Sequence, residues 1–269
     1  MIKAASCLSH FGEEPFLSGT KGAGAVFFSG CNLHCSYCQN FQISQQSIGK
    51  IFPEEELADE LLKLQDKGCH NIDLISPSHL INGIVKTLEI AKENGLKIPI
   101  IYNSNGYDTV DALKKIEGLI DIYLPDIKYS NNKIAFELSG IPGYVEVNRA
   151  AISEMFRQKG NILLDNEGIA EKGVLVRHLV LPNDLAGSCD SLDFLSGLSL
   201  DLWLSIMSQY TPCYKAADNQ LLNRKITVEE YEKVLTFAED LGFHNIFTQE
   251  MDSADNYLPD FMKDLPFDN

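Results

Sequence analysis

The sequence predicts an α/β protein whose architecture is an open, partial (β/α)6 barrel of the TIM-like kind. Three observations indicate this fold class. Short apolar runs alternate with amphipathic helical patterns from about residue 25 onward, as in repeated βα units around a mostly parallel sheet. The main series has six such runs, fewer than the eight strands of a closed barrel. The chain has 269 residues, of which 45% are hydrophobic, and this suits one enzyme-sized domain.

Each strand of the main series is an apolar run bounded by turn or helix signals, at residues 25–28, 72–75, 98–102, 120–124, 174–181 and 202–207, with a short strand-like run at 245–248. Apolar residues at helical spacing predict the intervening helices. One is bracketed by Pro53 and Gly68, one covers 80–91 and ends at Gly95, and Asp108 caps a third. A further helix covers about 148–158, and a capping box at 227–230 opens a last helix through about 241.

The expected domain spans residues 1–269, with a core at about 20–250, a short N-terminal lead and a C-terminal tail that packs on the barrel. The tail mixes acidic residues with Tyr257, Leu258 and Phe261, and these apolar side chains favour a segment that folds back. A solvated acidic tail is the alternative.

The charge of the chain restricts its partners. It carries 22 Lys and Arg against 38 Asp and Glu, a net charge of −16, and has no long basic cluster. Such a charge repels a phosphate backbone and disfavours nucleic acid as a substrate. The first residues lack the apolar core of a signal peptide, and no run of about 18 uncharged apolar residues occurs. We therefore expect a soluble, cytoplasmic protein that binds neither nucleic acid nor membrane.

Three of the seven cysteines, Cys31, Cys35 and Cys38, stand at a C-x3-C-x2-C spacing directly after the first predicted strand. Structural zinc sites have all four coordination positions filled by protein ligands, commonly supplied as two separated pairs of residues. Zinc with His34 as a fourth ligand is the alternative. Three thiolates in one tight loop suit a [4Fe–4S] cluster with one iron that lacks a protein ligand. That iron can bind the amino and carboxylate groups of S-adenosylmethionine (SAM), whose reduction yields a 5′-deoxyadenosyl radical.

The segment FFSGCNLHCSYCQN, residues 27–40, resembles the radical SAM superfamily, whose signature is C-x3-C-x-(aromatic)-C, and within it the branch related to pyruvate formate-lyase activating enzyme. Matches recur to the C-terminus. The resemblance implies the open (β/α)6 barrel of the radical SAM type, a [4Fe–4S] cluster, SAM, and Tyr37 packed beside the adenine; a space-filling role for Tyr37 is the alternative.

The resemblance also implies a class of reaction. The best-studied relatives use the adenosyl radical to form a glycyl radical on a partner enzyme, and an electron donor such as flavodoxin or ferredoxin is expected. An activating enzyme of this type is the first hypothesis. The alternatives are a radical SAM enzyme that modifies a small molecule or a peptide, and a non-catalytic iron–sulfur protein.

Polar residues at the carboxyl ends of the predicted strands are candidates for the cofactor pocket, because these ends meet at the active face of a parallel barrel. Ser78 and His79 stand where activating enzymes carry a Gly-Gly-Glu motif for the SAM amino group; a helix cap is the alternative. Asn103 follows the third strand in Asn-Ser-Asn-Gly, which resembles the family's Asp-Thr-Asn-Gly. Asp126 and Lys128 resemble its Asp-x-Lys, with Lys128 addressing the SAM carboxylate; a surface ion pair is the alternative.

Two residues are candidates for a catalytic role. Arg177 lies in an otherwise apolar strand, which a barrel tolerates where the charge faces the lumen or a partner, and it matches an arginine of the activating enzymes. His178 alternates to the opposite face and is expected to be a satisfied structural histidine. Gln209 and Tyr210 are candidates for contacting the ribose or carboxylate of SAM. Cys213 is the second catalytic candidate, although isolated cysteines more often act as small buried hydrophobes.

Overall fold

The computed structural model describes residues 1–251, 258–263 and 265–267. In this part of the chain one sheet of ten strands has the order β10-β9-β8-β6-β5-β4-β2-β1-β3, and β7 pairs with β8. The strands are β1 (Ile2–His10), β2 (Ala23–Phe28), β3 (Lys50–Phe52), β4 (Ile72–Ile75), β5 (Ile100–Ser104), β6 (Ile122–Pro125), β7 (Leu163–Leu164), β8 (Ala170–Leu179), β9 (Trp203–Met207) and β10 (Ile246–Thr248).

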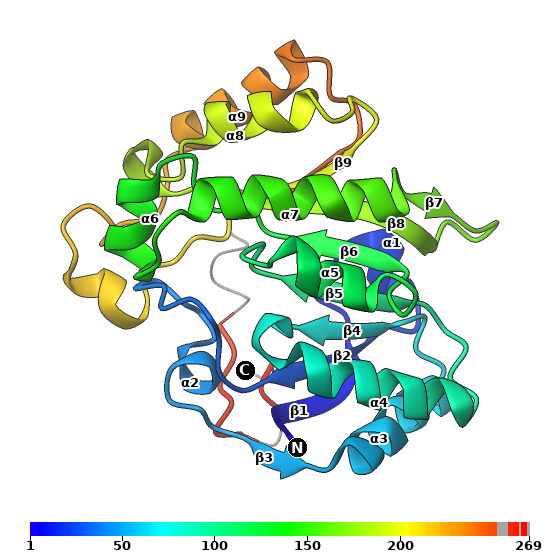
Figure 1. Ribbon diagram of the computed structural model, residues 1–269. Coiled ribbons are helices and arrows are strands. Elements are labelled where there is room, and N and C mark those ends of the chain that lie inside the picture. The colour runs from blue at the N-terminus through cyan, green and yellow to red at the C-terminus, as the bar shows by residue number, and fades with distance from the viewer. Residues whose placement is uncertain (252–257, 264, 268–269) are drawn as a thin grey trace.

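Most of the helices cover the outer side of the curved sheet (Figure 1), whereas the short helix after β1 enters the lumen and the short helix after the clustered cysteines lies at its mouth. The α-helices are α1 (Pro15–Ser18), α2 (Phe41–Ser44), α3 (Glu54–Asp66), α4 (Ile81–Glu93), α5 (Val110–Ile116), α6 (Asn132–Ser139), α7 (Tyr144–Lys159), α8 (Ser188–Ser196) and α9 (Val228–Asp240). Short 3-10 helices lie at η1 (Ser78–Leu80), η2 (Pro182–Asp184) and η3 (Tyr214–Asp218).

The predicted fold class is confirmed. The six strands of the main series, β2, β4, β5, β6, β8 and β9, pair in this order and run parallel to one another. β10, which corresponds to the short predicted run, extends the parallel series beside β9. Within the described residues, β10 and β3 are opposite edges of the sheet and do not pair with each other. The molecule is therefore an open, partial barrel.

Alternation along each strand separates an outer core from the lumen. On β8, Val176 packs in the core beneath the helices, whereas Leu175 faces inward. The inner residues near the base of the barrel pack around Phe16 and Leu17, which enter from the N-terminal segment. This apolar plug fills one end of the lumen, and the carboxyl ends of the strands surround the other.

The N-terminal segment is the main element that the sequence pattern failed to predict. β1 inserts antiparallel between β2 and β3, so residues 2–10 belong to the sheet and are not a separate lead. Ile2 and Ala4 are each 1% exposed, but the alternation fades after Ala4, which explains why the strand signal is weak. Phe16 and Leu17, which follow β1 in the chain, are also buried, at the base of the barrel.

Helix boundaries differ in two places. The predicted cap at Asp108 is wrong: Thr109 is the N-cap of α5 and accepts from Ala112 N, whereas Asp108 is buried and accepts a hydrogen bond from Tyr102 Oη. The helix expected at 148–158 begins at Tyr144, after the short helix α6, which was not predicted. The capping box that opens α9 is confirmed, with Thr227 and Glu230 bonded reciprocally.

The described part of the C-terminal tail contacts the barrel. The Phe261 and Phe267 rings each lie 5.3 Å from the Phe27 ring, which faces the lumen from β2. Tyr257, which the sequence placed in this contact, lies outside the described residues. Among the helices of the described chain, none combines the length and the apolar character needed to cross a membrane.

Candidate functional site

A cavity of about 480 Å³ opens at the carboxyl ends of the parallel strands and continues down into the lumen. Its wall brings together parts of the chain that are far apart in sequence. The three clustered cysteines line it together with most of the predicted strand-end residues, namely Tyr37, Asn103, Asp126, Lys128, Arg177 and Gln209. The arrangement is that of a ligand site at the active face of a parallel barrel.

The cysteine loop follows β2, and all three of its cysteines line the cavity. Burial raises the pKa of each thiol, to about 12 for Cys35 and about 11 for Cys38. The thiolate form that binds metals therefore needs compensation from neighbouring donors and cations. His34, the alternative fourth ligand, is exposed and bonds to Gln45 through Nδ1 at 2.8 Å.

Each of these sulfur atoms lies against a hydrogen-bonding group of the protein. Cys31 Sγ accepts from Leu33 N at 3.4 Å and from Asn105 Nδ2 at 3.3 Å. Cys35 Sγ accepts from Ser139 Oγ at 3.0 Å, and Cys38 Sγ lies 3.2 Å from Ser44 Oγ. Donors aimed at sulfur stabilise thiolates that carry a metal cluster.

The donor set fits a cluster ligated by three cysteines. In the described chain, no three His, Cys, Asp or Glu side chains form a group that could hold a metal ion. An iron–sulfur cubane binds each cysteine through a different iron, so its ligands surround a wider space than the ligands of one ion do. Three cysteines around one cavity, each with its sulfur beside a hydrogen-bonding group, match that requirement.

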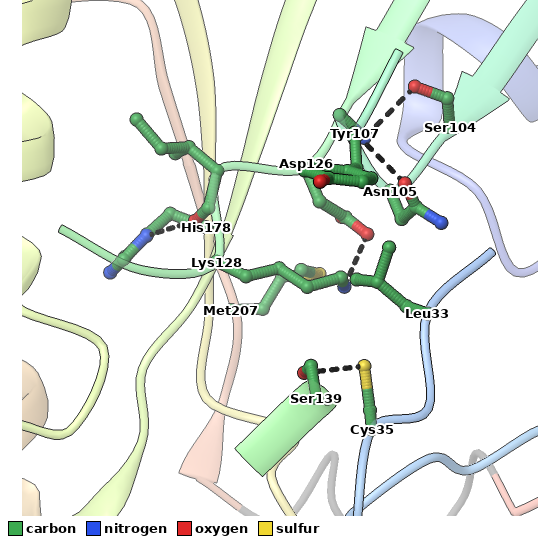
Figure 2. Close-up of polar contacts among 12 residues, drawn as sticks. Leu33, Cys35, Ser104, Asn105, Tyr107, Asp126, Lys128, Ser139, His178 and Met207 are labelled. Carbon is green, nitrogen blue, oxygen red and sulfur yellow. Dashed lines mark hydrogen bonds and ion pairs between the residues drawn. The ribbon is translucent and has the colours of Figure 1, made fainter. Parts of the chain in front are cut away.

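Asp126 and Lys128 form an ion pair directly after β6, with Lys128 Nζ 2.6 Å from Asp126 Oδ2. Their side chains are only 22% and 18% exposed, so this is not a surface pair. Figure 2 shows the Lys128 side chain reaching toward Asp126, with Cys35 and Ser139 below it. Burial lowers the pKa of Lys128, but the charge of Asp126, its hydrogen bond and the nearby Cys35 and Cys38 together outweigh burial and raise the pKa, so the ammonium is retained.

A set of polar groups fixes the loops on either side of this pair. Tyr144 Oη donates to Asn105 O at 3.1 Å and accepts from Lys128 N at 2.9 Å, which ties the loops after β5 and β6 together. Asn148 Nδ2 donates to Gly106 O and Asp126 O. Asn103 lines the cavity but its amide donates to Asp73, deeper in the lumen, at 3.2 Å.

Arg177 faces the lumen, as its position in an apolar strand suggested, and His178 faces the opposite way. The Arg177 guanidinium binds two carboxylates: Nε donates to Glu14 Oε1 at 2.8 Å, and the guanidinium also contacts Glu13. His178 is 2% exposed, with Nδ1 2.7 Å from Ile127 O and Nε2 2.8 Å from Ser188 Oγ. Its hydrogen-bonding groups are thus satisfied within the protein.

Four predicted site residues do not line the cavity. Ser78 and His79 lie in η1, and His79 Nε2 bonds to Ser29 O at 2.9 Å; Ser76 lines the cavity in their place. Tyr210 is buried and donates to Leu222 O at 2.7 Å, so it supports the wall from behind. Cys213 donates to Tyr37 O at 3.3 Å. A position near a strand end therefore does not by itself predict that a side chain lines the cavity, because buried tertiary contacts decide this.

Tyr37 is 6% exposed and lies at the start of a buried hydrogen-bond chain. Tyr37 Oη is 2.7 Å from Tyr129 Oη, which is 2.6 Å from Ser139 Oγ, the donor to Cys35. Sequence reasoning missed Tyr129 and Ser139 because nothing in the local pattern around α6 shows that this helix end meets the cysteine loop. It also missed Glu13, Glu14 and Asp73; only Asp73 had a signal, as a charged residue within an apolar strand.

Comparison with known proteins agrees with this geometry. Residues 25–164 match the family profile of the radical SAM superfamily. Over 248 residues the chain is 33% identical to an uncharacterized protein of Methanocaldococcus jannaschii, and the match covers 88% of this chain and 67% of that protein. Over 113 residues it is 32% identical to the pyruvate formate-lyase-activating enzyme of Clostridium pasteurianum, covering 39% of this chain and 44% of that enzyme.

Solved structures show the same fold. The structure of Streptococcus suis SuiB bound to the precursor peptide SuiA superposes with a TM-score of 0.57 at 13% identity, covering 86% of this chain. The chain spans only 49% of the length of SuiB, and this likeness concerns the fold alone. Since the matched family profile extends over more than half of the sequence and includes the cysteine loop, the chain belongs to the radical SAM superfamily.

Proposed function

We propose that this protein is a radical SAM enzyme that carries its [4Fe–4S] cluster on Cys31, Cys35 and Cys38. Membership of the superfamily implies the cluster, SAM, a substrate and a reductant. When bound, the two cofactors together supply a 5′-deoxyadenosyl radical that abstracts hydrogen from the substrate. The observation that carries the proposal is that the three clustered cysteines and the buried Asp126–Lys128 pair line one cavity.

The residues of the cavity wall fall into two groups, one for SAM and one for the cluster. Lys128 supplies the positive charge that binds the SAM carboxylate, and Asp126 keeps the Lys128 side chain charged and oriented. The carboxamide of Asn105 holds Cys31, and Tyr37 and Gln209 supply wall surface for the nucleoside. Because Ser78 and His79 lie outside the cavity wall, we assign the SAM amino group to neither of them.

The first candidate substrate is a glycine of a partner protein, so that the enzyme is a glycyl-radical activating enzyme. Its support is the 32% identity to the activating enzyme of Clostridium pasteurianum over 113 residues, which is a part of each chain. The second candidate is a small molecule or peptide side chain. Its support is the buried ionic layer of Glu13, Glu14 and Arg177, which gives the inner cavity polar groups suited to binding a charged substrate.

The reductant is proposed to be a flavodoxin or a ferredoxin. Superfamily membership calls for a one-electron donor, and both are small proteins that deliver single electrons at low potential. All seven cysteines are free of disulfides in the described chain, which suits a reducing compartment and supports a cytoplasmic location.

The deciding experiment uses anaerobically reconstituted protein with dithionite and SAM. Release of 5′-deoxyadenosine and methionine is expected, and an intact cluster without either product would refute the radical assignment. The substrate candidates are then separated by electron paramagnetic resonance after incubation with cell extract. A new glycyl radical supports the activating role, whereas its absence alongside active SAM cleavage favours the second candidate.

A further inference from the structure

An ionic layer crosses the lumen between the apolar plug and the cysteine loop. Arg177 comes from β8, and Glu13 and Glu14 come from the segment between β1 and α1. Their side chains are 15%, 6% and 7% exposed. Two nitrogen atoms of Arg177 donate hydrogen bonds to Glu14, at 2.8 and 2.5 Å, and the guanidinium also contacts Glu13. The guanidinium is therefore committed to carboxylates of its own chain and is not available to an anionic substrate.

A third carboxyl group lies behind this layer. Asp73 on β4 shares the lumen face with Ile75, whose side chain lines the cavity, because alternate residues of a strand point the same way. Asp73 is 0% exposed. Its Oδ2 accepts from Asn103, but Oδ1 has no hydrogen-bond donor among the described residues. Burial, and then the adjacent charge of Glu13, raise the pKa of Asp73 well above its usual value.

The charges of the layer do not cancel. Three carboxyl groups, those of Glu13, Glu14 and Asp73, face one guanidinium. With Asp73 protonated, one negative charge is still unbalanced. His10 lies 3.9 Å from Glu13, but burial lowers its pKa, so it remains neutral and does not supply the missing charge. An unbalanced buried charge is costly, and a cation placed beside it from the cavity removes that cost.

The position of this charge is suited to a substrate. Glu13 and Glu14 line the same cavity as Cys31, Cys35 and Cys38, so a molecule held at the ionic layer extends toward the cysteine loop. The cavity volume of about 480 Å³ lies in the range of small-ligand sites. Carboxylates at the inner end select against anionic groups, which would meet like charge in a water-poor setting.

We propose that Glu13, backed by Asp73, binds a protonated amine of the substrate, so that the substrate class is a compound or side chain that carries a primary ammonium group. The inference rests on the proposed function in that the cavity is taken to be the place where hydrogen is abstracted. Glu14 is a positioning residue here, since its two hydrogen bonds with Arg177 hold the guanidinium, and with it the ionic layer, in place.

The test uses reconstituted protein and three probes of similar shape: n-butylammonium, n-butanol and butyrate. Binding is titrated by saturation-transfer NMR, and SAM cleavage by the same preparation is measured in parallel. The ammonium probe is expected to bind at least about tenfold more tightly than the other two. Glu13→Gln is expected to remove most of this preference, whereas Glu171→Gln, at an exposed site on β8, should retain it.

The outcomes separate the inference from the function on which it rests. Equal binding of butyrate and n-butylammonium to the wild-type protein would overturn the inference without reference to any variant, and so would an unchanged preference in folded Glu13→Gln protein. A clear preference for n-butylammonium without SAM cleavage would support the ammonium site and refute the proposed function. The peptide acetyl-Gly-Lys-Gly-amide distinguishes the source of the amine: tighter binding than n-butylammonium assigns it to a lysine side chain, and weaker binding to a small molecule.

Discussion

Ser139 Oγ donates a hydrogen bond to Cys35 Sγ over 3.0 Å, although the two residues are 104 positions apart in the sequence. Both are buried, and Tyr129 and Tyr37 continue the hydrogen-bond chain away from the sulfur. The last residue of α6 thus reaches the cysteine loop directly (Figure 2). A donor at this position stabilises negative charge on the sulfur and therefore favours the reduced state of a cluster bound there.

Replacing Ser139 by Ala is expected to lower the midpoint potential of the cluster. Loss of one hydrogen bond of about 1 kcal/mol corresponds to a decrease on the order of 40 mV for a one-electron couple. A redox titration followed by electron paramagnetic resonance measures this directly. Ser153→Ala, which removes a hydroxyl that donates to Arg149 O within α7, is the matched control and should leave the potential unchanged. An equal potential in both variants would contradict the assignment.

Replacing Lys128 by Met is expected to weaken SAM binding by at least about tenfold, because the substitution removes the cation that we propose for the SAM carboxylate and leaves Asp126 without its partner. The Kd for SAM is measured by equilibrium dialysis on reconstituted protein. Lys133→Met serves as the control, since its side chain is 83% exposed and its ion pair with Glu137 is long, at 3.9 Å. If both variants bind SAM as the wild type does, Lys128 does not contact the cofactor.

Replacing Cys35 by Ala is expected to reduce the iron content of the reconstituted protein to background, because two cysteines do not hold a cubane cluster. Cys69→Ala is the matched control. Cys69 is also buried, at 3% exposed, but its sulfur lies 3.1 Å from Ser9 Oγ, far along the chain from the cysteine loop. Iron and acid-labile sulfide are quantified in both variants. Unchanged iron in the Cys35 variant would refute the proposed ligation.

The buried ring of His178 links stability to pH. Burial lowers the pKa of His178 from 6.5, so the folded protein keeps the ring neutral while the unfolded chain protonates it near pH 6.5. The unfolded state then binds more protons below pH 6.5, and the free energy of unfolding falls as the pH decreases, by up to about 1.4 kcal/mol per pH unit. This contribution is fully present above pH 6.5.

The effect is measured by urea unfolding at pH 7.5 and 5.5. His10 also has a lowered pKa and adds to the wild-type dependence, so the informative quantity is the difference between wild type and His178→Gln. The variant is expected to be less stable overall and less sensitive to pH. His244→Gln, at a side chain that is 61% exposed, should follow the wild type. A His178 variant with the full wild-type pH dependence would disprove the link.

The sequence by itself determined the parallel framework and the cysteine loop. Three features are local patterns, which side-chain periodicity and spacing determine: the six apolar runs of the main series, the capping box at Thr227 and the three clustered cysteines. The sequence also predicted Asp126, Lys128 and Arg177 as site residues. The carboxyl ends of parallel strands meet at one face of the barrel, and a charged residue in an apolar strand is tolerated only where it faces the lumen or a partner.

Only the tertiary structure decided what completes the site. Ser139 reaches Cys35, and Glu13 and Glu14 reach Arg177, across more than 100 residues, and no local pattern encodes such a contact. Asn103 lies near the carboxyl end of strand β5 and lines the cavity, whereas Ser78 and His79 come after the end of β4, where η1 turns them away from it. The physical reason is that a strand end fixes where a loop begins, whereas packing of distant segments fixes which of its side chains enter the lumen.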